Sequence, residues 1–303
     1  MRAVRALASG RVRLVEEVPV PKLRPGEVRV ATRAVGVCGS DVHVWHGTQT
    51  YPMRFPVTLG HEEIGEILEL GEGVVGWSVG QRVVSETART VCGRCQQCRE
   101  GWYNLCTERV GFWALIDESM ADSFVTRHAI LHAVPDALSD AVAATAEPYC
   151  VAFNAVVERA PVRPGDTVGV IGPGAIGVFS AQIASQCGAS DVLVVGVPAD
   201  AERLRLARTM GATDTVAVVG DAWWHKGSYE STCDVAAWCQ LLPDVPDKPR
   251  QPLFVPPQSG LRRLPMVPSP LAEKESTRLR VSWVGGLLGV VLWLSRQAAC
   301  ALT

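Results

Sequence analysis

The segment TVGVIGPGAIG, residues 167–177, decides the fold of the second half of the chain. Its apolar start, 167–171, predicts a buried strand, and the motif Gly172-x-Gly174-x2-Gly177 follows directly. A helical stretch then runs from Ala175 to Cys187 and ends at Gly188. A strand, a glycine turn and a helix in this order are typical of a dinucleotide-binding unit.

Each glycine of this motif has a separate task. Gly172 permits the tight turn, Gly174 lets a pyrophosphate approach the backbone, and Gly177 allows close packing of the helix. The first helical residues, Ala175 and Ile176, offer backbone N–H groups and partial positive charge to an anion. The motif alone is also compatible with a glycine-rich turn in an ordinary strand–helix unit.

The acidic residue expected about 20 residues further on, which would bind the ribose of NAD, is missing. Gly196-Val197-Pro198 occupies that place. Asp200 would serve the ribose if the loop folded back, whereas Arg203, with Arg205 beyond it, would meet the 2′-phosphate of NADP or simply face solvent. The sequence therefore leaves the choice between NAD and NADP open.

The surrounding sequence predicts an α/β chain with three parts. Residues 1–155 are rich in short alternating runs such as Gln81-Arg82-Val83-Val84, an all-β pattern with frequent turns. Residues 156–220 alternate strands and helices and predict a partial Rossmann domain, the start of a doubly wound parallel sheet. Residues 221–303 carry dense prolines and tryptophans and predict an irregular tail.

Two groups of metal-binding residue types lie in the first part. Four cysteines lie within fifteen residues and predict a closed, structural Zn²⁺ site; they are Cys92, Cys95, Cys98 and Cys106. Cys38 and the run Gly60-His61-Glu62 offer sulfur, nitrogen and oxygen donors from separate segments. Such a set suits a second zinc site that keeps one position for water or substrate.

Together these motifs resemble the zinc-containing medium-chain alcohol dehydrogenases, most closely the polyol (sorbitol or L-iditol) and threonine dehydrogenase branch. The resemblance covers residues 1 to about 219. It rests on GVCGSDVH at 36–43, GHEEIG at 60–65, the four-cysteine loop, Glu147-Pro148 and the glycine motif. It implies that residues 1–155 form a GroES-like domain.

The resemblance also implies roles for single residues. Cys38 and His61 match catalytic zinc ligands, and Glu62 and Glu147 match carboxylates that bind the metal or lie just behind it. Ser40 and His43 match a relay that passes the proton of the alcohol outward. From the residues themselves, Asp41 is expected to fix the turn after Cys38 without a chemical part.

The implied reaction is hydride transfer from an alcohol or polyol to NAD(P). Zinc would lower the pKa of the bound alcohol, so that an alkoxide forms near neutral pH. The alternative is a catalytically inactive, truncated or frameshifted remnant that still binds zinc, because a complete member would continue the sheet beyond about Gly220. The resemblance suggests a homo-oligomer, but the strands that would pair the subunits are missing.

Composition restricts the partners. The formal net charge of −2 gives no broad attraction for nucleic acid or an anionic membrane. The chain opens without a leader pattern, which predicts a cytoplasmic protein. The apolar run from Val281 to Leu294 is shorter than the roughly 20 residues that span a bilayer, and is expected to be a core or sticky segment. A three-stranded parallel sheet would leave one edge unpaired.

Overall fold

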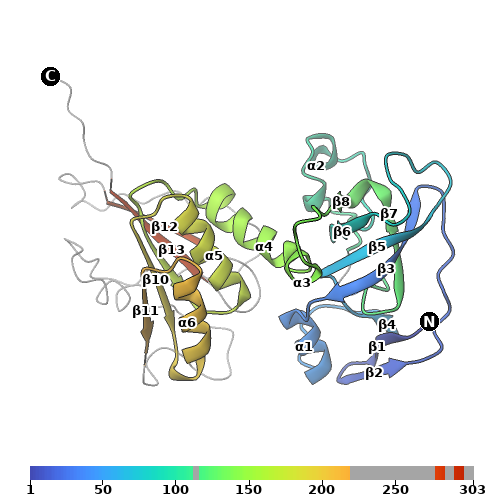
Figure 1. The fold of residues 1–303 in the computed structure, drawn as a ribbon, viewed down its shortest axis with the longest axis horizontal. Helices are drawn as coiled ribbons and strands as arrows, with labels where there is room; N and C mark the ends of the chain where they lie inside the picture. Colours follow the sequence, from blue (N-terminus) through green and yellow to red (C-terminus); the bar gives the residue numbers. More distant parts are fainter. Residues whose placement is uncertain (112–115, 219–276, 284–289, 297–303) are drawn as a thin grey trace. The chain divides into compact units, whose positions relative to one another are not determined.

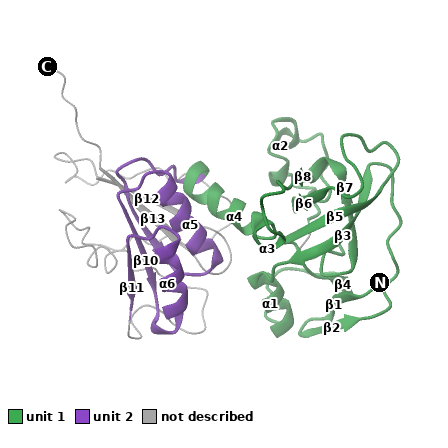
Figure 2. Cartoon of the chain, viewed as in Figure 1, with its two compact units in different colours: residues 1–158, 284–287 green, residues 159–283, 288–303 purple. Residues whose placement is uncertain are grey.

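The computed structural model describes residues 1–111, 116–218, 277–283 and 290–296. The chain divides into two compact units (Figure 2). Unit 1 includes Met1–Glu158, and unit 2 begins at Arg159. No helix among the described residues is long and apolar enough to cross a membrane.

Unit 1 contains two antiparallel sheets (Figure 1). The smaller has the order β2-β1-β4 and the larger the order β7-β3-β5-β6-β8. The strands are β1 (Ala3–Ala8), β2 (Arg11–Val15), β3 (Glu27–Val35), β4 (Val57–Thr58), β5 (Glu63–Leu70), β6 (Arg82–Ser85), β7 (Ser123–Arg127) and β8 (Leu131–Ala133). The helices are α1 (Gly39–His46), α2 (Gln96–Arg99), α3 (Asp140–Ala143) and α4 (Ala146–Phe153), with 3-10 turns η1 (Tyr103–Leu105) and η2 (His128–Ile130) and the π-helical η3 (Asn154–Arg159).

The core of unit 1 follows from the alternation in its strands. Val28 and Val30 of β3 point to the same face and are fully buried with Ile67, Val83 and Phe124. Gly65 lets β5 lie against β3, since a Cβ there would be 2.4 Å from the carbonyl oxygen of Ala31. The first residue of β5 follows Glu62 directly, so this packing also fixes the segment that carries His61.

The described residues of unit 2 form a five-stranded sheet of order β11-β10-β9-β13-β12. Strands β9, β10 and β11 are parallel, as the sequence predicts. Their bounds, with those of the helices between them, are β9 (Thr167–Ile171), α5 (Ala175–Gln186), β10 (Asp191–Gly196), η4 (Pro198–Asp200), α6 (Ala201–Thr209) and β11 (Asp214–Ala217). Helices α5 and α6 lie side by side on one face of this sheet (Figure 1).

The expectation of an irregular tail over 221–303 is wrong for two segments. Strands β12 (Thr277–Trp283) and β13 (Val290–Arg296) pair antiparallel, and β13 pairs antiparallel with β9. The β9 side of the three-stranded parallel sheet therefore has a hydrogen-bonding partner, while β11 stays at an edge of the described sheet, in line with the expectation of one unpaired edge. The two described segments favour strand because they contain β-branched and aromatic residues, such as Val281 and Trp283 in β12 and Val290, Val291 and Trp293 in β13. The proline-rich stretch lies outside the described residues.

Candidate metal centres and cofactor turn

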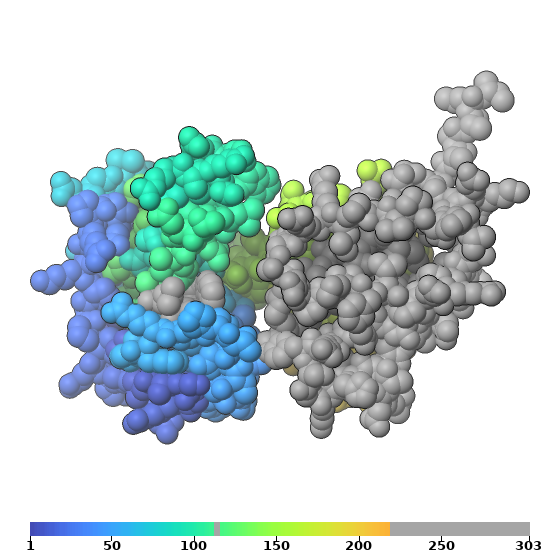
Figure 3. Space-filling view, turned by 180° about the vertical axis from the view of Figure 1, so that it is seen from behind, coloured from blue at the N-terminus to red at the C-terminus, as the bar shows by residue number. Residues whose placement is uncertain are grey.

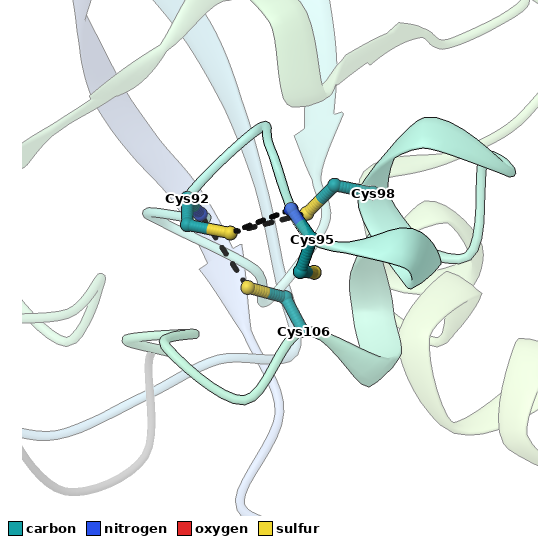
Figure 4. A group of neighbouring side chains, drawn as sticks. All are labelled: Cys92, Cys95, Cys98 and Cys106. Atoms are coloured by element: carbon teal, nitrogen blue, oxygen red, sulfur yellow. Dashed lines mark hydrogen bonds between the residues drawn. The ribbon is translucent and has the colours of Figure 1, made fainter.

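The four predicted cysteines come together in the loop around α2. Their four Sγ atoms all lie within 4.8 Å of one another; the residues are Cys92, Cys95, Cys98 and Cys106. Figure 4 shows the side chains turned toward one another, and Figure 3 shows this segment, in teal, on the surface of unit 1. The Sγ atoms of Cys92 and Cys98 are 4.0 Å apart, close to the roughly 3.8 Å edge of a tetrahedron with Zn–S bonds of about 2.3 Å.

Backbone N–H groups donate hydrogen bonds to sulfurs of this cluster, which stabilises the negatively charged thiolate form. Cys95 N–H donates to the sulfur of Cys92 at 3.3 Å, and Cys92 N–H donates to the sulfur of Cys106 at 3.4 Å. Hydrogen bonds from the N–H groups of Arg94 and Cys95 lower the pKa of Cys92. Four converging sulfurs with such donors fit a structural Zn²⁺ ion.

The residues of the predicted second zinc site, the one with an open coordination position, also lie close together. Donor atoms of Cys38, His61 and Glu62 lie within 4.8 Å of one another. Cys38 is the N-cap of α1, and the other two residues precede β5. Gly36 makes room for the carboxylate, because a Cβ there would be 2.3 Å from Glu62 Oε2. Sulfur, nitrogen and oxygen donors from separate segments leave a fourth position of a tetrahedron for a small ligand.

The charges around His61 fit a cation. Burial opposes the charged imidazolium, but Cys38 and then Glu118 raise the pKa of His61 to about 12. Burial raises the pKa of Glu62, although His61 acts in the opposite direction. His61 Nδ1 is buried without a hydrogen-bond partner among the described residues. A histidine with so many acidic groups around it favours a positive ion nearby, and the donor types suit Zn²⁺.

Glu147 lies on α4 and is not one of the three clustered donors. Its pKa is raised by burial, lowered by the charge of His61 and raised again by Glu62. The carboxylate therefore lies within electrostatic range of the site. Its role as a ligand, direct or through water, stays a prediction.

The predicted proton relay lies on α1. His43 Nδ1 is 2.8 Å from Thr48 Oγ1, and the hydroxyl of Tyr51 donates to the backbone oxygen of Ser40 at 3.3 Å. Burial, followed by the charge of Asp41, raises the pKa of Tyr51 to about 12. Sequence reasoning did not name Thr48 or Tyr51. Both residues follow the relay motif closely in the chain, and their polar hydroxyl groups could have marked them as hydrogen-bonding partners of the relay.

Two acidic residues near His61, Asp41 and Glu118, differ in their hydrogen bonding. Asp41 accepts a hydrogen bond from Cys38 N–H at 3.0 Å, which confirms the expectation that it fixes this turn. Glu118 was not predicted, although Asp41, His61 and Glu118 form a second group with donor atoms within 4.8 Å. Burial raises the pKa of Glu118 to about 7, while the neighbouring imidazole of His61 lowers it. Because the residue is 57 positions from His61 in the chain, sequence spacing gave no signal.

The glycine turn has the predicted arrangement. Gly172 has φ +92°, and α5 begins at Ala175 after the N-cap Gly174. A Cβ at Gly177 would be 1.9 Å from the carbonyl oxygen of Gly172, so helix and turn touch backbone to backbone. The N-cap makes no side-chain hydrogen bond, which leaves the N–H groups around Ala175 and Ile176 without a capping side chain. This geometry suits a bound pyrophosphate.

The loop after β10 folds back toward the strand end. Asp200 Oδ2 accepts a hydrogen bond from Val197 N–H at 3.2 Å and would be 3.3 Å from a Cβ at Gly196. Arg203 donates to Asp200 Oδ1 at 3.5 Å, and Arg205 pairs with Glu202 at 2.7 Å. A carboxylate thus stands beside the position where the sequence lacks one.

Comparisons with known proteins agree with these observations. Residues 24–136 match the alcohol dehydrogenase GroES-like domain. The sorbitol dehydrogenase of Halalkalibacterium halodurans is 42% identical over 65% of this chain and 56% of its own length. The sorbitol dehydrogenase of Bacillus subtilis is 38% identical over 67% of this chain and 57% of its own.

Among solved structures, a zinc-binding dehydrogenase from Sinorhizobium meliloti bound to NADP has a TM-score of 0.66 and 30% identity, covering 73% of this chain and 65% of that one. The chain spans just over half the length of the two sorbitol dehydrogenases it matches. The similarity reaches from the GroES-like domain into the Rossmann-like second unit. The chain belongs to the zinc-containing medium-chain alcohol dehydrogenase family, with its polyol and threonine dehydrogenase-like members.

Proposed function

We propose that this protein oxidises a secondary alcohol, most naturally a polyol, with transfer of hydride to a nicotinamide cofactor. The observation that carries the proposal is the convergence of Cys38, His61 and Glu62 in a chain that also has the glycine turn of a dinucleotide site. Similarity to sorbitol dehydrogenases supports a polyol as substrate. Zinc bound at this cluster would supply the Lewis acidity that lowers the pKa of the substrate hydroxyl.

The protein's own groups divide the remaining work. Cys38 and His61 would hold the metal, and Glu62 or Glu147 would complete its coordination or orient its ligands. Ser40 would accept the proton of the substrate hydroxyl while giving its own hydroxyl proton to His43. His43 would hold that proton as an imidazolium, and Thr48 Oγ1, 2.8 Å from its Nδ1, would accept a hydrogen bond from the ring.

The geometry after β10 supports NAD as the preferred cofactor. The carboxylate of Asp200 beside Gly196 would accept a hydrogen bond from the ribose 2′-hydroxyl and repel a 2′-phosphate. Arg203, which was considered for the 2′-phosphate, is already within 3.5 Å of Asp200. We therefore expect Arg203 to keep the loop in place rather than to select NADP.

The direct test is turnover by the full, zinc-loaded chain. NADH formation is followed by absorbance with sorbitol and other polyols, beside a Cys38→Ser variant as control. Polyol-dependent NADH formation that the variant lacks would support the proposal. Zinc and NADH binding without turnover on any polyol would favour the inactive, zinc-binding remnant, and turnover that survives Cys38→Ser would refute the assigned metal site.

A further inference from the structure

The geometry points to Glu118 as a positioning residue that holds the ring of His61 by accepting a hydrogen bond from Nδ1–H, and so presents Nε2 to the bound metal. This inference rests on the metal site proposed above. Glu118 does not reach the reacting atoms. It would act only through the orientation and tautomer of His61.

The contact is between two buried groups that lack other partners. His61 Nδ1 lies 3.5 Å from Glu118 Oε2, and the two residues are 6% and 2% exposed. Among the described residues, Nδ1 and both carboxylate oxygens of Glu118 have no hydrogen-bond partner. Unpartnered buried polar groups are costly, so each of these groups needs the other. A small rotation would bring the distance into the usual range of about 2.7–3.2 Å.

Asp41 is the other carboxylate near this nitrogen, but it has a different task. Its Oδ2 accepts a hydrogen bond from Cys38 N–H at 3.0 Å and so closes the turn at the start of α1. Glu118 has no competing bond among the described residues. Of these two carboxylates, Asp41 thus has a backbone partner, whereas His61 is the group that accounts for the position of Glu118.

The backbone delivers Glu118 to this position independently of any metal. Glu118 N–H donates to the carbonyl of Thr58 at 3.1 Å, and Ser119 N–H and Oγ–H both donate to that of Gly60 at 2.9 and 2.8 Å. Gly60 has φ +103°, and a Cβ there would be 2.5 Å from Met120 Cγ. The segment that carries Glu118 and the segment that carries His61 are thus held in fixed register.

Loss of a residue that hydrogen-bonds to a metal ligand is expected to lower the affinity for the metal. When a histidine ligand has a hydrogen-bonded partner on its second nitrogen, loss of that partner typically weakens metal binding by about 10- to 100-fold. The effect should be confined to the site that contains His61. The four-cysteine site, built from a separate loop, provides an internal control in the same molecule.

The test is a zinc titration of the full chain against a chromophoric chelator, with variants Glu118→Leu and Glu118→Gln. Leucine has no acceptor, so one of the two zinc ions should bind about 10- to 100-fold more weakly while the other is unchanged. Glutamine keeps an acceptor oxygen, so its loss should be smaller. ¹⁵N NMR of the zinc-loaded protein should show His61 bound to the metal through Nε2 with Nδ1 protonated in wild type, and a mixture of Nε2- and Nδ1-bound rings in the leucine variant.

The matched control is Glu63→Gln. Glu63 is also buried and lies close by in sequence, but it accepts its hydrogen bond from Ser85 N–H at 3.1 Å. Both zinc affinities should stay within about twofold of wild type in this variant. A loss as large as that of Glu118→Leu would mean that any buried carboxylate change disturbs the site, which would contradict a specific role.

Three other results would overturn the inference. Glu118→Leu with both zinc affinities unchanged would leave Glu118 a packing role only. A third zinc ion in wild type, lost in both Glu118 variants, would mean that Asp41, His61 and Glu118 bind a cation themselves. If Glu118→Leu fails to fold, Glu118→Ala, which also lacks an acceptor, takes its place, and zinc affinities and His61 ¹⁵N signals equal to wild type would refute the positioning role. Polyol turnover plays no part in these readouts, so the two proposals can fail separately.

Discussion

Substitution of Gly177 by alanine should damage both unit 2 and its cofactor site. The added Cβ would be 1.9 Å from the carbonyl oxygen of Gly172, whereas an ordinary contact needs about 3.4 Å or more. To reach an ordinary contact, helix α5 and the turn must therefore separate by about 1.5 Å. Because both contacting groups are backbone, no side-chain rotation relieves the contact, and we expect a loss of about 3 kcal/mol in unfolding free energy.

The same displacement would move the N–H groups at the start of α5 away from the pyrophosphate. We expect NADH affinity to fall at least about tenfold, equivalent to about 1.4 kcal/mol. Urea unfolding of unit 2 and NADH titration by tryptophan fluorescence measure the two effects. Ser180→Ala is the control on the same helix: its buried Oγ has no hydrogen-bond partner in the described part of the chain, so stability should be unchanged or slightly higher. An alanine at 177 that leaves both stability and NADH affinity at wild-type values would refute the close-packing argument.

Three further predictions concern other parts of the molecule. Cys106→Ser should remove one zinc ion per chain by elemental analysis and make the loop around α2 sensitive to protease, and a full zinc count in the variant would contradict a closed four-sulfur site. Burial raises the pKa of Glu63 from 4.5 to about 8, although the hydrogen bond from Ser85 N–H acts in the opposite direction, so the protonated carboxyl favours the folded state. The unfolding free energy of the metal-free protein should therefore fall as pH rises from about 4.5 to 8. In urea unfolding, Glu63→Gln should make this dependence on pH weaker. Asp200→Asn should weaken NADH and strengthen NADPH in fluorescence titrations, because the repulsion of the 2′-phosphate is removed, and an unchanged ratio would exclude Asp200 from the ribose site.

Local patterns explain why the glycine turn and the metal donors could be predicted. The motif from Gly172 to Gly177 is contiguous, and its place between an apolar strand and a helical stretch predicts a turn followed by a helix. The four cysteines lie in one loop, and Cys38 and His61 carry donor types that few structural roles need.

What was missed depends on contacts between distant segments. Glu118 reaches His61 only because backbone hydrogen bonds join its segment to residues 58–60, which no spacing rule reveals. Strand β13 pairs with β9 across more than 100 residues, and the dense prolines before it argued against strands. The approach of Asp200 to Gly196 required the turn of η4, which the sequence only offered as one possibility.

The most direct test of the account is whether the cluster of Cys38, His61 and Glu62 binds a metal ion with an open coordination position. Cobalt replaces zinc in the full chain, and its visible spectrum is recorded while imidazole is added as a small external ligand. We expect a saturable change in the spectrum that disappears in Cys38→Ser, while the signal of the four-cysteine site stays constant. A spectrum from one closed cobalt site, unchanged by imidazole and by the substitution, would contradict the catalytic metal centre.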